Sequence, residues 1–354
     1  MNKKTKSLKR RKIVIGINGF GRIGRAVFRV IAKRSNIEVA AINDINPDNK
    51  NIAYQLKYDS LYGTFPDPIS DSPEGIAVGK KKIAVYHTEN IDEVPWEKQG
   101  VSIVVDSSGV YENVLRASGL RKKIDNVIMT HSPNEMKVDK TIIMGVNESK
   151  LNPKKDFLIS SSICDANAIA PVLHLLNQRF GIQHGFLTTI HPWLTYQNLL
   201  DGPSPSFAYP GHINPHYTFG RASTFSLLPK PTSTMTAVCK VIPELEGKFS
   251  SFSYRVPTAI VSSSDVSIKL QKRANTEDIK KLFKEVVRKQ RFDVIYNNEE
   301  PLVSIDFKGL PYSSIVDHRW ITVNDENYLK VILWYDNEWG YASRVADVIS
   351  LLQK

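Results

Sequence analysis

The segment that decides the fold of this 354-residue chain is Lys12-Ile-Val-Ile-Gly-Ile-Asn-Gly-Phe-Gly-Arg-Ile-Gly-Arg25, an apolar strand followed by a glycine turn and the start of a helix. Its three glycines have the spacing G-x-G-x-x-G. One glycine allows a tight turn, one lets the backbone approach a pyrophosphate, and one permits close contact between helix and strand. A pyrophosphate would lie at the helix N-terminus, where free N–H groups and the helix dipole favour an anion. The segment therefore predicts a nucleotide-binding turn.

A second apolar run, Ile37-Glu-Val-Ala-Ala-Ile-Asn-Asp44, ends in an acidic residue about twenty positions after the last glycine. In dinucleotide-binding folds an acid at this distance accepts a hydrogen bond from a ribose hydroxyl. Asp44 is the predicted acceptor, and because its charge would repel a 2'-phosphate, we expect NAD as the cofactor and not NADP. The alternative is a glycine-tolerant turn followed by an ordinary surface aspartate, which explains fewer of these features together.

The composition indicates a folded protein of two domains. With 42% hydrophobic residues, a chain of this length can bury large cores. Its two cysteines, Cys164 and Cys239, are too few for a disulfide framework, which favours a reducing compartment and hence the cytoplasm. The sequence contains no apolar stretch of membrane-spanning length and no apolar core of a secretory signal, so we expect no association with a membrane.

The formal net charge of +11 is concentrated at the N-terminus. Residues 1–12 carry seven basic groups and no acid, so this segment supplies most of the net charge. We expect it to be a basic, disordered tail. A basic tail can contact nucleic acid or anionic lipid, but the segment lacks interleaved aromatic residues and a folded basic face, so no nucleic-acid partner is predicted.

The hydrophobic pattern divides the chain into two regions. Up to about Ser161, short β-branched runs alternate with amphipathic stretches, which predicts a doubly wound, mostly parallel sheet. The expected strands are Ile13 to Ile15, Ile37 to Ile42, Lys82 to Tyr86, Ile103 to Asp106, Val127 to Thr130 and Thr141 to Met144.

Beyond Ser161 we expect an α+β arrangement with mainly antiparallel strands. The expected helices are Ile169 to Phe180, Thr276 to Lys289 and Gly340 to Lys354; the expected strands are Gly185 to Ile190, Lys248 to Val256, Asp265 to Leu270, Leu302 to Phe307, Arg319 to Val323 and Leu329 to Tyr335. Between them, residues 203–216 are rich in Pro, Gly, Ser and aromatic residues. This composition predicts a long ordered loop, and such loops are usually functional.

Several further motifs make the chain similar to the phosphorylating glyceraldehyde-3-phosphate dehydrogenase family, and the resemblance extends from Lys12 to the C-terminus. These motifs are Leu56-Lys-Tyr-Asp-Ser-Leu-Tyr-Gly63, Cys164-Asp-Ala-Asn-Ala-Ile-Ala-Pro171, Thr188-Thr-Ile-His191, Lys240-Val-Ile-Pro-Glu-Leu245, Arg255-Val-Pro-Thr258 and Trp334-Tyr-Asp-Asn-Glu-Trp-Gly-Tyr341. The resemblance implies an α/β Rossmann NAD-binding domain formed by residues 13–163 and 337–354. It also implies an α+β catalytic domain with a mainly antiparallel sheet (164–336), and a homotetramer in which the long loop lines a neighbour's cofactor site.

The resemblance assigns the chemistry to two residues. Cys164 matches the family nucleophile and is expected at the start of a helix, where the N-terminus lowers a thiol pKa and favours the thiolate. His191 follows at the end of a predicted strand and matches the family base, which takes the proton of the thiohemiacetal and helps to hold its oxyanion. Taken without these motifs, an isolated Cys or His is more often structural. Cys239 lies inside a helical pattern, so we expect it to be inert.

The implied reaction is NAD-dependent oxidation of an aldehyde through a thiohemiacetal and a thioester, which a second nucleophile releases. The residues implied to bind the cofactor are Asn18, Gly19, Phe20, Gly21, Arg22, Ile23, Asp44, Ser108, Gly109 and Asn337. Those implied to bind a substrate anion are Arg255, Thr232 and Arg221. No metal is expected. The predicted partner is a small aldehyde, and whether it is phosphorylated, and whether inorganic phosphate takes part, stays open.

The chain departs from the family where anions bind. Ile163 and Asp165 flank the nucleophile where the family has serine and threonine, and Leu194 replaces a threonine after the catalytic histidine. A carboxylate beside the nucleophile would repel phosphate and raise the thiol pKa unless it turns away as a helix cap. The long loop is also extended by residues 207–217, and with Trp193 and Tyr196 its aromatic residues could reshape the aldehyde pocket.

Three other functions remain open from the sequence. The first is a related dehydrogenase that uses a different aldehyde or releases its thioester to water. The second is a non-catalytic nucleotide-binding or RNA-binding paralogue, which the basic tail and the altered pocket favour but the retained Cys164 and His191 oppose. The third is a semialdehyde or acyl-phosphate reductase, which the runs 334–341 and 255–258 match poorly.

Overall fold

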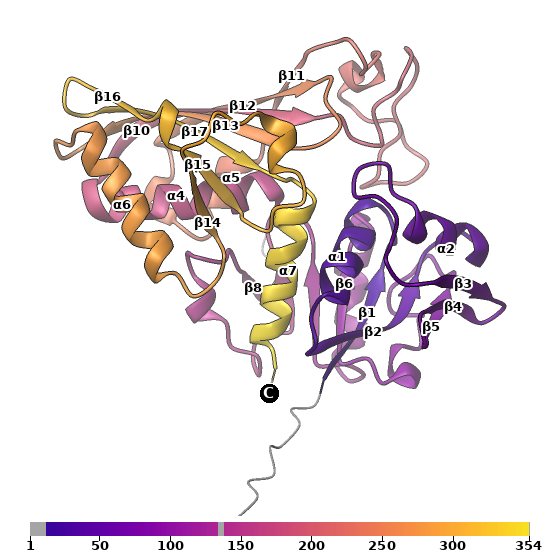
Figure 1. Cartoon of the computed structure of the whole chain (residues 1–354). Helices are drawn as coiled ribbons and strands as arrows, with labels where there is room; N and C mark the ends of the chain where they lie inside the picture. Colours follow the sequence, from indigo (N-terminus) through magenta and orange to yellow (C-terminus); the bar gives the residue numbers. More distant parts are fainter. Residues whose placement is uncertain (1–11, 134–137, 354) are drawn as a thin grey trace, which may run out of the picture.

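The computed structural model describes residues 12–133 and 138–353, which form two β-sheets with helices packed against them (Figure 1). The expected basic tail, apart from Lys12, lies outside the described residues. Lys12 forms an exposed ion pair with Glu38, with 3.3 Å between Nζ and Oε2. No helix in the described part of the chain has the length and apolar character needed to cross a bilayer.

The first sheet has nine strands in the order β3-β4-β5-β2-β1-β6-β7-β9-β8. The pairs from β5 to β8 are parallel, and only the β3–β4 and β4–β5 pairs are antiparallel, so the predicted mostly parallel sheet is confirmed. The strands are β1 (Ile13–Asn18), β2 (Ile37–Asn43), β3 (Ile69–Ser72), β4 (Gly75–Val78), β5 (Lys81–Tyr86), β6 (Ile103–Asp106), β7 (Asn126–Met129), β8 (Lys140–Thr141) and β9 (Leu158–Ser160).

The central strands of this sheet are covered on both faces, which explains why β1 is an almost continuous apolar run. The helices α1 (Arg22–Ala32), α2 (Asn49–Lys57) and α3 (Tyr111–Arg116) belong to this region. Gly16 leaves space inside β1 for Trp96, because a Cβ atom there would lie 2.4 Å from the indole ring. Because β2, β1 and β6 are adjacent and parallel, their carboxyl ends lie side by side.

The second sheet has the order β11-β12-β10-β13-β17-β15-β14, with β16 paired to β17. Most pairs are antiparallel, as predicted, whereas β10–β12 and β14–β15 are parallel. The strands are β10 (Ile182–Pro192), β11 (Leu228–Pro231), β12 (Phe249–Val256), β13 (Ser262–Leu270), β14 (Ile295–Asn298), β15 (Ser314–Asp317), β16 (Thr322–Asn324) and β17 (Tyr328–Tyr335).

In this region one strand prediction was wrong, and a second, Arg319 to Val323, is confirmed only at its end, where β16 begins at Thr322. The segment predicted as a strand from Leu302 to Phe307 contains a 3-10 turn, η6 (Ser304–Phe307), and the unpredicted β15 is one of the strands that pair with β17. The strand predicted from Arg319 begins instead with η7 (His318–Trp320), which the Asp317 carboxylate caps by accepting from the Arg319 N–H. A local hydrogen bond thus displaced the extended conformation that the β-branched residues favoured.

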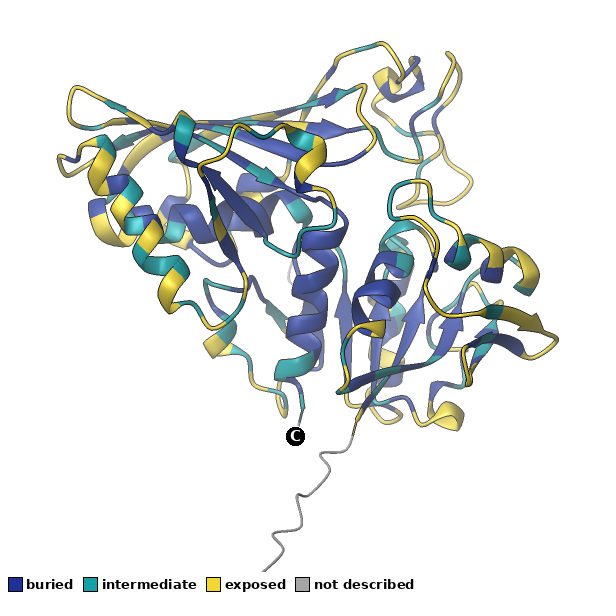
Figure 2. Cartoon of the chain, in the orientation of Figure 1, coloured by how far each residue is buried: buried dark blue, intermediate teal, exposed yellow. Residues whose placement is uncertain are grey.

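Four further helices complete the fold: α4 (Cys164–Phe180), α5 (Thr234–Cys239), α6 (Thr276–Lys289) and α7 (Trp339–Leu351). Figure 2 shows α7 as an almost entirely buried helix, and in Figure 1 α7 stands between the two sheets. Partly buried ion pairs fix it to the first region: Arg22 with Glu338, and Arg34 with Asp347. The C-terminal helix therefore packs back against α1, as the resemblance implied.

The segment 203–216 is a long irregular loop at the upper right of Figure 1. Its ends are tied by an isolated bridge between Pro205 and Ile213. It reaches the first region, where the Tyr111 N–H donates to the Ala208 carbonyl at 3.2 Å. Tyr196, predicted to shape the pocket, packs edge-to-face against Phe207 of this segment and against Phe219 in the 3-10 turn that follows it (Tyr217–Gly220).

Candidate active site

The two predicted catalytic side chains meet where α4 begins and β10 ends. Cys164 is the first residue of α4, and His191 is the penultimate residue of β10. The Sγ atom of Cys164 lies 3.7 Å from Nε2 of His191. His191 is buried and Cys164 is partly exposed. Residues 27 positions apart in the sequence thus form one reactive centre.

A third group, the Asp165 carboxylate, completes this centre. The Cys164 thiol donates to its Oδ1 at 3.3 Å, and the same oxygen lies 3.9 Å from Nε2 of His191. None of the described side chains caps α4, so Asp165 has not turned away to become a helix cap. Burial and the Asp165 charge together raise the pKa of the Cys164 thiol well above its ordinary value. The expected lowering of this pKa by the helix N-terminus is therefore wrong for the resting centre.

His191 is held as a neutral base. Burial and the nearby Arg255 cation lower its pKa to about 4. Its Nδ1 lies 2.8 Å from the Pro192 carbonyl, an acceptor, so the proton of the neutral ring belongs on Nδ1. Nε2 then presents a lone pair to the Cys164 sulfur, which is the tautomer that a general base requires.

Two residues that the sequence did not single out hold Asp165 in place. The buried Tyr335 hydroxyl donates to Oδ1 at 2.9 Å, and the Thr234 hydroxyl lies 3.4 Å from Oδ2. Although burial alone would raise the pKa of Asp165, electrostatic interactions with His191 and Arg255 and the Tyr335 hydrogen bond lower it. Tyr335 immediately precedes Asp336-Asn337 in a motif already recognised, and Thr234 begins α5. The signals were present, but only the fold brings these residues to Asp165.

The predicted anion-binding residues separate into two groups. Arg255 is buried and is the register partner of His191 in the parallel β10–β12 pair. Its Nη1 lies 3.4 Å from Ser253 Oγ, and its Nε has no hydrogen-bond partner among the described residues. Thr232 reaches the centre indirectly, because its hydroxyl lies 2.7 Å from that of Thr234. Arg221 is exposed and paired with Asp201, and the structure places no part of the reactive centre against it.

Lys230 is a cation that sequence reasoning missed. It lies on β11, next to β12, and its charge acts on Cys164, Asp165 and Arg255. Burial and Arg255 lower the pKa of Lys230 to about 8. Two cations, Lys230 and Arg255, therefore lie close enough to Cys164 to interact electrostatically with it.

The glycine turn has the geometry that its spacing predicted. Gly19 has a φ of +82°, and a Cβ there would lie 2.5 Å from the Ser108 backbone nitrogen. A Cβ on Gly24 would lie 2.2 Å from the Gly19 carbonyl, so helix and strand could not approach as closely. Gly21 borders open space, and none of the described side chains caps the α1 N-terminus. Backbone N–H groups of Arg22 and Ile23 there are available to an anion.

Asp44 lies at the edge of this turn. Its Oδ2 accepts from the Phe20 N–H at 2.6 Å and its Oδ1 accepts from the Asn46 N–H at 2.9 Å. Asn18 bridges the neighbouring strand ends, since its Nδ2 donates to Asp106 at 2.7 Å and its Oδ1 accepts from Asn43. Asp106 was not predicted; it also accepts from the Ser108 hydroxyl at 2.8 Å. The turn is thus braced by a buried polar network.

The remaining predicted cofactor residues surround the same region. Ser108 and Gly109 follow β6, and Gly109 has a φ of +72°. Asn337 is buried at the start of the C-terminal segment, and its Oδ1 has no hydrogen-bond partner among the described residues. A buried amide with an unpaired oxygen has a hydrogen-bonding group left for a ligand. The open α1 N-terminus and Asn337 therefore fit a dinucleotide that carries an amide.

Comparison with known protein families gives two matches. Residues 13–114 match the model of the glyceraldehyde 3-phosphate dehydrogenase NAD binding domain, and residues 163–337 match that of its C-terminal domain. This chain belongs to the glyceraldehyde-3-phosphate dehydrogenase family. Among its relatives is the cytosolic glyceraldehyde-3-phosphate dehydrogenase of Chlamydomonas reinhardtii, 38% identical over 95% of this chain and 96% of the relative.

Further relatives agree with this assignment. Glyceraldehyde-3-phosphate dehydrogenase 1 of Kluyveromyces marxianus is 37% identical over 95% of this chain and 98% of the relative. The enzyme of the same name from Bacillus cereus is 36% identical over 96% of this chain and 98% of its own length. As a member of the glyceraldehyde-3-phosphate dehydrogenase family, the chain is an NAD-dependent oxidoreductase, which confirms the predicted fold, cofactor and class of reaction.

The second cysteine differs from the first. Cys239 ends the short helix α5 and packs against the hydrophobic core. Burial and Glu246 raise the pKa of its thiol. Without a histidine partner among the described residues, Cys239 lacks the features that activate a cysteine nucleophile.

Proposed function

We propose that Cys164 is the nucleophile and His191 the base in the oxidation of a phosphorylated three-carbon aldehyde. The observation that carries this assignment is the 3.7 Å separation of Cys164 Sγ and His191 Nε2, with the unprotonated nitrogen facing the sulfur. The relatives' names indicate glyceraldehyde 3-phosphate as the substrate. The buried Arg255, in register with His191, supports an anionic substrate.

The resting centre requires proton transfer before attack. In the resting state Cys164 is a thiol, Asp165 a carboxylate and His191 a neutral imidazole. His191 Nε2 takes the thiol proton as Sγ attacks the aldehyde carbon, and the imidazolium then stabilises the oxyanion and donates this proton to it, which gives the thiohemiacetal hydroxyl and a neutral His191. Bound NAD supplies the acceptor for the hydride that leaves this carbon. His191 takes up the hydroxyl proton as the thioester forms.

The remaining cofactor assignments follow the turn. Asn18, Gly19, Phe20, Gly21, Arg22, Ile23, Asp44, Ser108, Gly109 and Asn337 are proposed to hold the dinucleotide. The open N-terminus of α1 supports a pyrophosphate there, and the unpaired Asn337 oxygen supports a contact to the nicotinamide carboxamide. Arg255, Thr232 and Arg221 are proposed anion contacts, and Arg221 would leave its partner Asp201 to bind an anion.

Asp165 favours a second candidate, in which water and not phosphate releases the thioester. Its buried carboxylate touches the reacting sulfur, and a phosphate dianion approaching the thioester would meet this charge. Ile163 and Leu194 provide no side-chain hydroxyl on either side of the centre. Water is uncharged and meets no such repulsion.

Steady-state assays with NAD distinguish the two candidates. Glyceraldehyde 3-phosphate and glyceraldehyde are compared, each with and without inorganic phosphate. Phosphate-dependent NADH formation with the phosphorylated aldehyde supports the first candidate, and equal rates without phosphate support the second. Asp165→Thr should increase phosphate-dependent turnover in either case. Absence of NADH formation with both aldehydes would contradict the proposed function.

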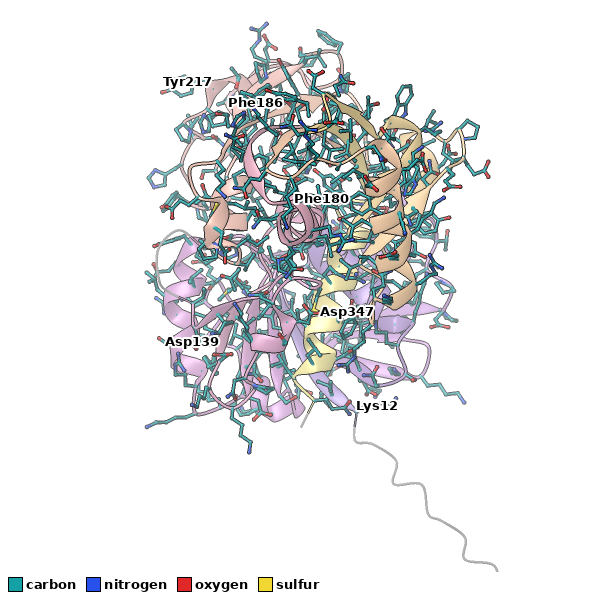
Figure 3. All side chains as sticks on the ribbon, turned by 90° about the vertical axis from the view of Figure 1, so that its left-hand side faces the viewer. Lys12, Asp139, Phe180, Phe186, Tyr217 and Asp347 are labelled. Atoms are coloured by element: carbon teal, nitrogen blue, oxygen red, sulfur yellow. The ribbon has the colours of Figure 1, made fainter. Side chains whose placement is uncertain are left out.

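We also propose that the chain is a cytoplasmic homotetramer with the domain division predicted from its sequence (13–163 with 337–354, and 164–336). The ion pairs that join α7 to α1 support the division, and the relatives named cytosolic support the compartment. An apolar outer face of the second sheet supports assembly: Phe186, Ile190 and Phe252 are 61%, 38% and 43% exposed. Figure 3 shows Phe186 at this upper surface. Sedimentation velocity tests the tetramer, and a monomer would contradict it.

A further inference from the structure

Three potential metal ligands converge at the start of α4. The atoms Cys164 Sγ, Asp165 Oδ1 and His191 Nε2 are separated by 3.3 Å (S to O), 3.7 Å (S to N) and 3.9 Å (N to O). In a tetrahedral zinc site the metal lies about 2.3 Å from sulfur and about 2.0–2.1 Å from nitrogen or oxygen, which puts pairs of ligand atoms roughly 3.3–3.6 Å apart. Binding zinc therefore requires the N–O edge to contract by about half an ångström, the S–N edge to contract slightly and the S–O edge to widen by a few tenths of an ångström.

The surroundings prepare each group to bind a cation. His191 Nδ1 pairs with the Pro192 carbonyl, which leaves the lone pair on Nε2 and fixes the ring, as backbone carbonyls do behind metal-bound histidines. Tyr335 and Thr234 hold the two carboxylate oxygens of Asp165. These outer contacts fix the orientation of ligating side chains before any metal arrives.

The charge and the accessibility of the centre are compatible with a divalent metal. When zinc replaces the Cys164 proton, that proton leaves to solvent, and Zn²⁺, one thiolate and one carboxylate sum to zero charge. The neighbouring Arg255 and Lys230 cations then face a neutral centre. The combination of thiolate and imidazole favours zinc over the hard cations magnesium and calcium. Cys164 is only partly buried.

We propose that Cys164, Asp165 and His191 form a three-ligand zinc site with an open fourth position, and that zinc bound there reversibly blocks catalysis. The metal would occupy the sulfur lone pair that attacks the aldehyde and the nitrogen lone pair that accepts the proton. This inhibitory site goes beyond the proposed function. Its metal affinity is measured without turnover, so failure of the zinc proposal leaves the proposed enzyme activity independently testable.

Cobalt(II) provides the test, because thiolate-bound tetrahedral cobalt absorbs in the near ultraviolet and visible ranges. The full chain is treated with a chelator, dialysed and titrated with cobalt, and zinc then competes. We expect one thiolate-to-cobalt band that zinc abolishes, which persists in Cys239→Ser and is absent in Cys164→Ser. Asp165→Asn and His191→Gln should each weaken zinc binding by at least the about tenfold that loss of an outer-shell partner costs.

Activity provides a second readout. Zinc should inhibit NADH formation, and EDTA should restore it. The proposal is overturned if the unmodified chain shows no thiolate-to-cobalt band with metal in severalfold excess, or if Cys164→Ser retains that band. It is also overturned if Asp165→Asn, checked for native circular dichroism, binds zinc as tightly as the unmodified chain. Should that variant misfold, the comparison of Cys164→Ser with Cys239→Ser decides.

Discussion

The Asp165 carboxylate lies 3.3 Å from the sulfur of its neighbour Cys164 and accepts a hydrogen bond from it. This contact exists because Asp165 points into the protein, where Tyr335 donates to the same oxygen at 2.9 Å. The negative charge of Asp165 favours the thiol form of Cys164 over the thiolate. The proposed nucleophile is thus protonated at rest, and in the proposed mechanism its activation depends on His191.

The Asp165 charge should therefore suppress alkylation of the free enzyme. Because the pKa of the Cys164 thiol is raised, its thiolate fraction increases with pH through and above the neutral range, and the iodoacetamide rate should increase with it. Asp165→Asn removes the charge and retains the shape, so the profile should shift to lower pH and the rate at pH 7 should rise by about tenfold. The alkylation rate is measured by quenching the reaction at successive times and quantifying the modified Cys164 peptide by mass spectrometry.

Asp201→Asn provides the matched control, because Asp201 is an exposed carboxylate paired with Arg221. Its alkylation profile should equal that of the unmodified chain. An unchanged profile in Asp165→Asn would show that the thiol pKa does not depend on this carboxylate.

Arg255 should determine the preference for a phosphorylated aldehyde. A charge-assisted hydrogen bond to phosphate contributes about 1.5–3 kcal/mol, so Arg255→Ala should lower kcat/KM for glyceraldehyde 3-phosphate by roughly ten- to a hundredfold. The value for glyceraldehyde should change much less. Arg273→Ala, which removes an exposed arginine paired with Glu326, is the control and should leave both values nearly unchanged. Equal losses for the two aldehydes in Arg255→Ala would remove Arg255 from phosphate recognition.

Asp44 should set the choice between NAD and NADP. The unmodified enzyme should use NAD with the higher kcat/KM, because the Asp44 carboxylate repels a 2'-phosphate. Asp44→Ala should reduce the preference, although it also removes the acceptor of the Phe20 N–H. Asp71→Ala, at an exposed position of β3, controls for a general change of surface charge. Equal efficiencies with both cofactors in the unmodified enzyme would contradict the assignment.

Arg22 should stabilise the junction between α1 and α7. Its guanidinium pairs with Asp59 at 2.7 Å and with Glu338 at 2.5 Å, and both carboxylates are largely buried. Burial opposes the Arg22 charge, but Glu338 and Asp59 outweigh it and raise the pKa of Arg22. Arg22→Ala leaves two buried charges unpaired and should cost about 3–5 kcal/mol of unfolding free energy in urea.

The comparison for that experiment is Arg273→Ala, which breaks an ion pair exposed to solvent on both sides. Pairs of this kind contribute little, so its unfolding midpoint should stay near that of the unmodified chain. A loss in Arg22→Ala no larger than in Arg273→Ala would mean that α7 is held by apolar packing alone.

The sequence predicted most of the fold because its regular segments carry clear periodicity. The helix Thr276–Lys289 was predicted at its observed bounds, where the Asn275 and Asp278 capping box fixes its start. Residues 304–307 were misassigned because short apolar runs in turns resemble strands. The parallel pairing of β10 with β12 could not be predicted, since it depends on which strand ends meet in space.

The candidate site was predicted unevenly for a similar reason. Cys164, His191 and the glycine turn stand in recognisable motifs, whereas Tyr335, Thr234 and Lys230 act through contacts that only the fold creates. The sequence indicated that Asp165 would either cap α4 or face the sulfur. Only the packing of Tyr335 against α4 decides between these orientations.

The central claim, covalent catalysis by Cys164, is tested most directly by trapping the intermediate. Enzyme, NAD and glyceraldehyde 3-phosphate are mixed without inorganic phosphate, quenched in acid during the first turnover and mapped by peptide mass spectrometry. The account predicts one acyl adduct, on Cys164, absent in Cys164→Ser and unchanged in Cys239→Ser. An adduct on Cys239, or normal NADH formation by Cys164→Ser, would contradict it.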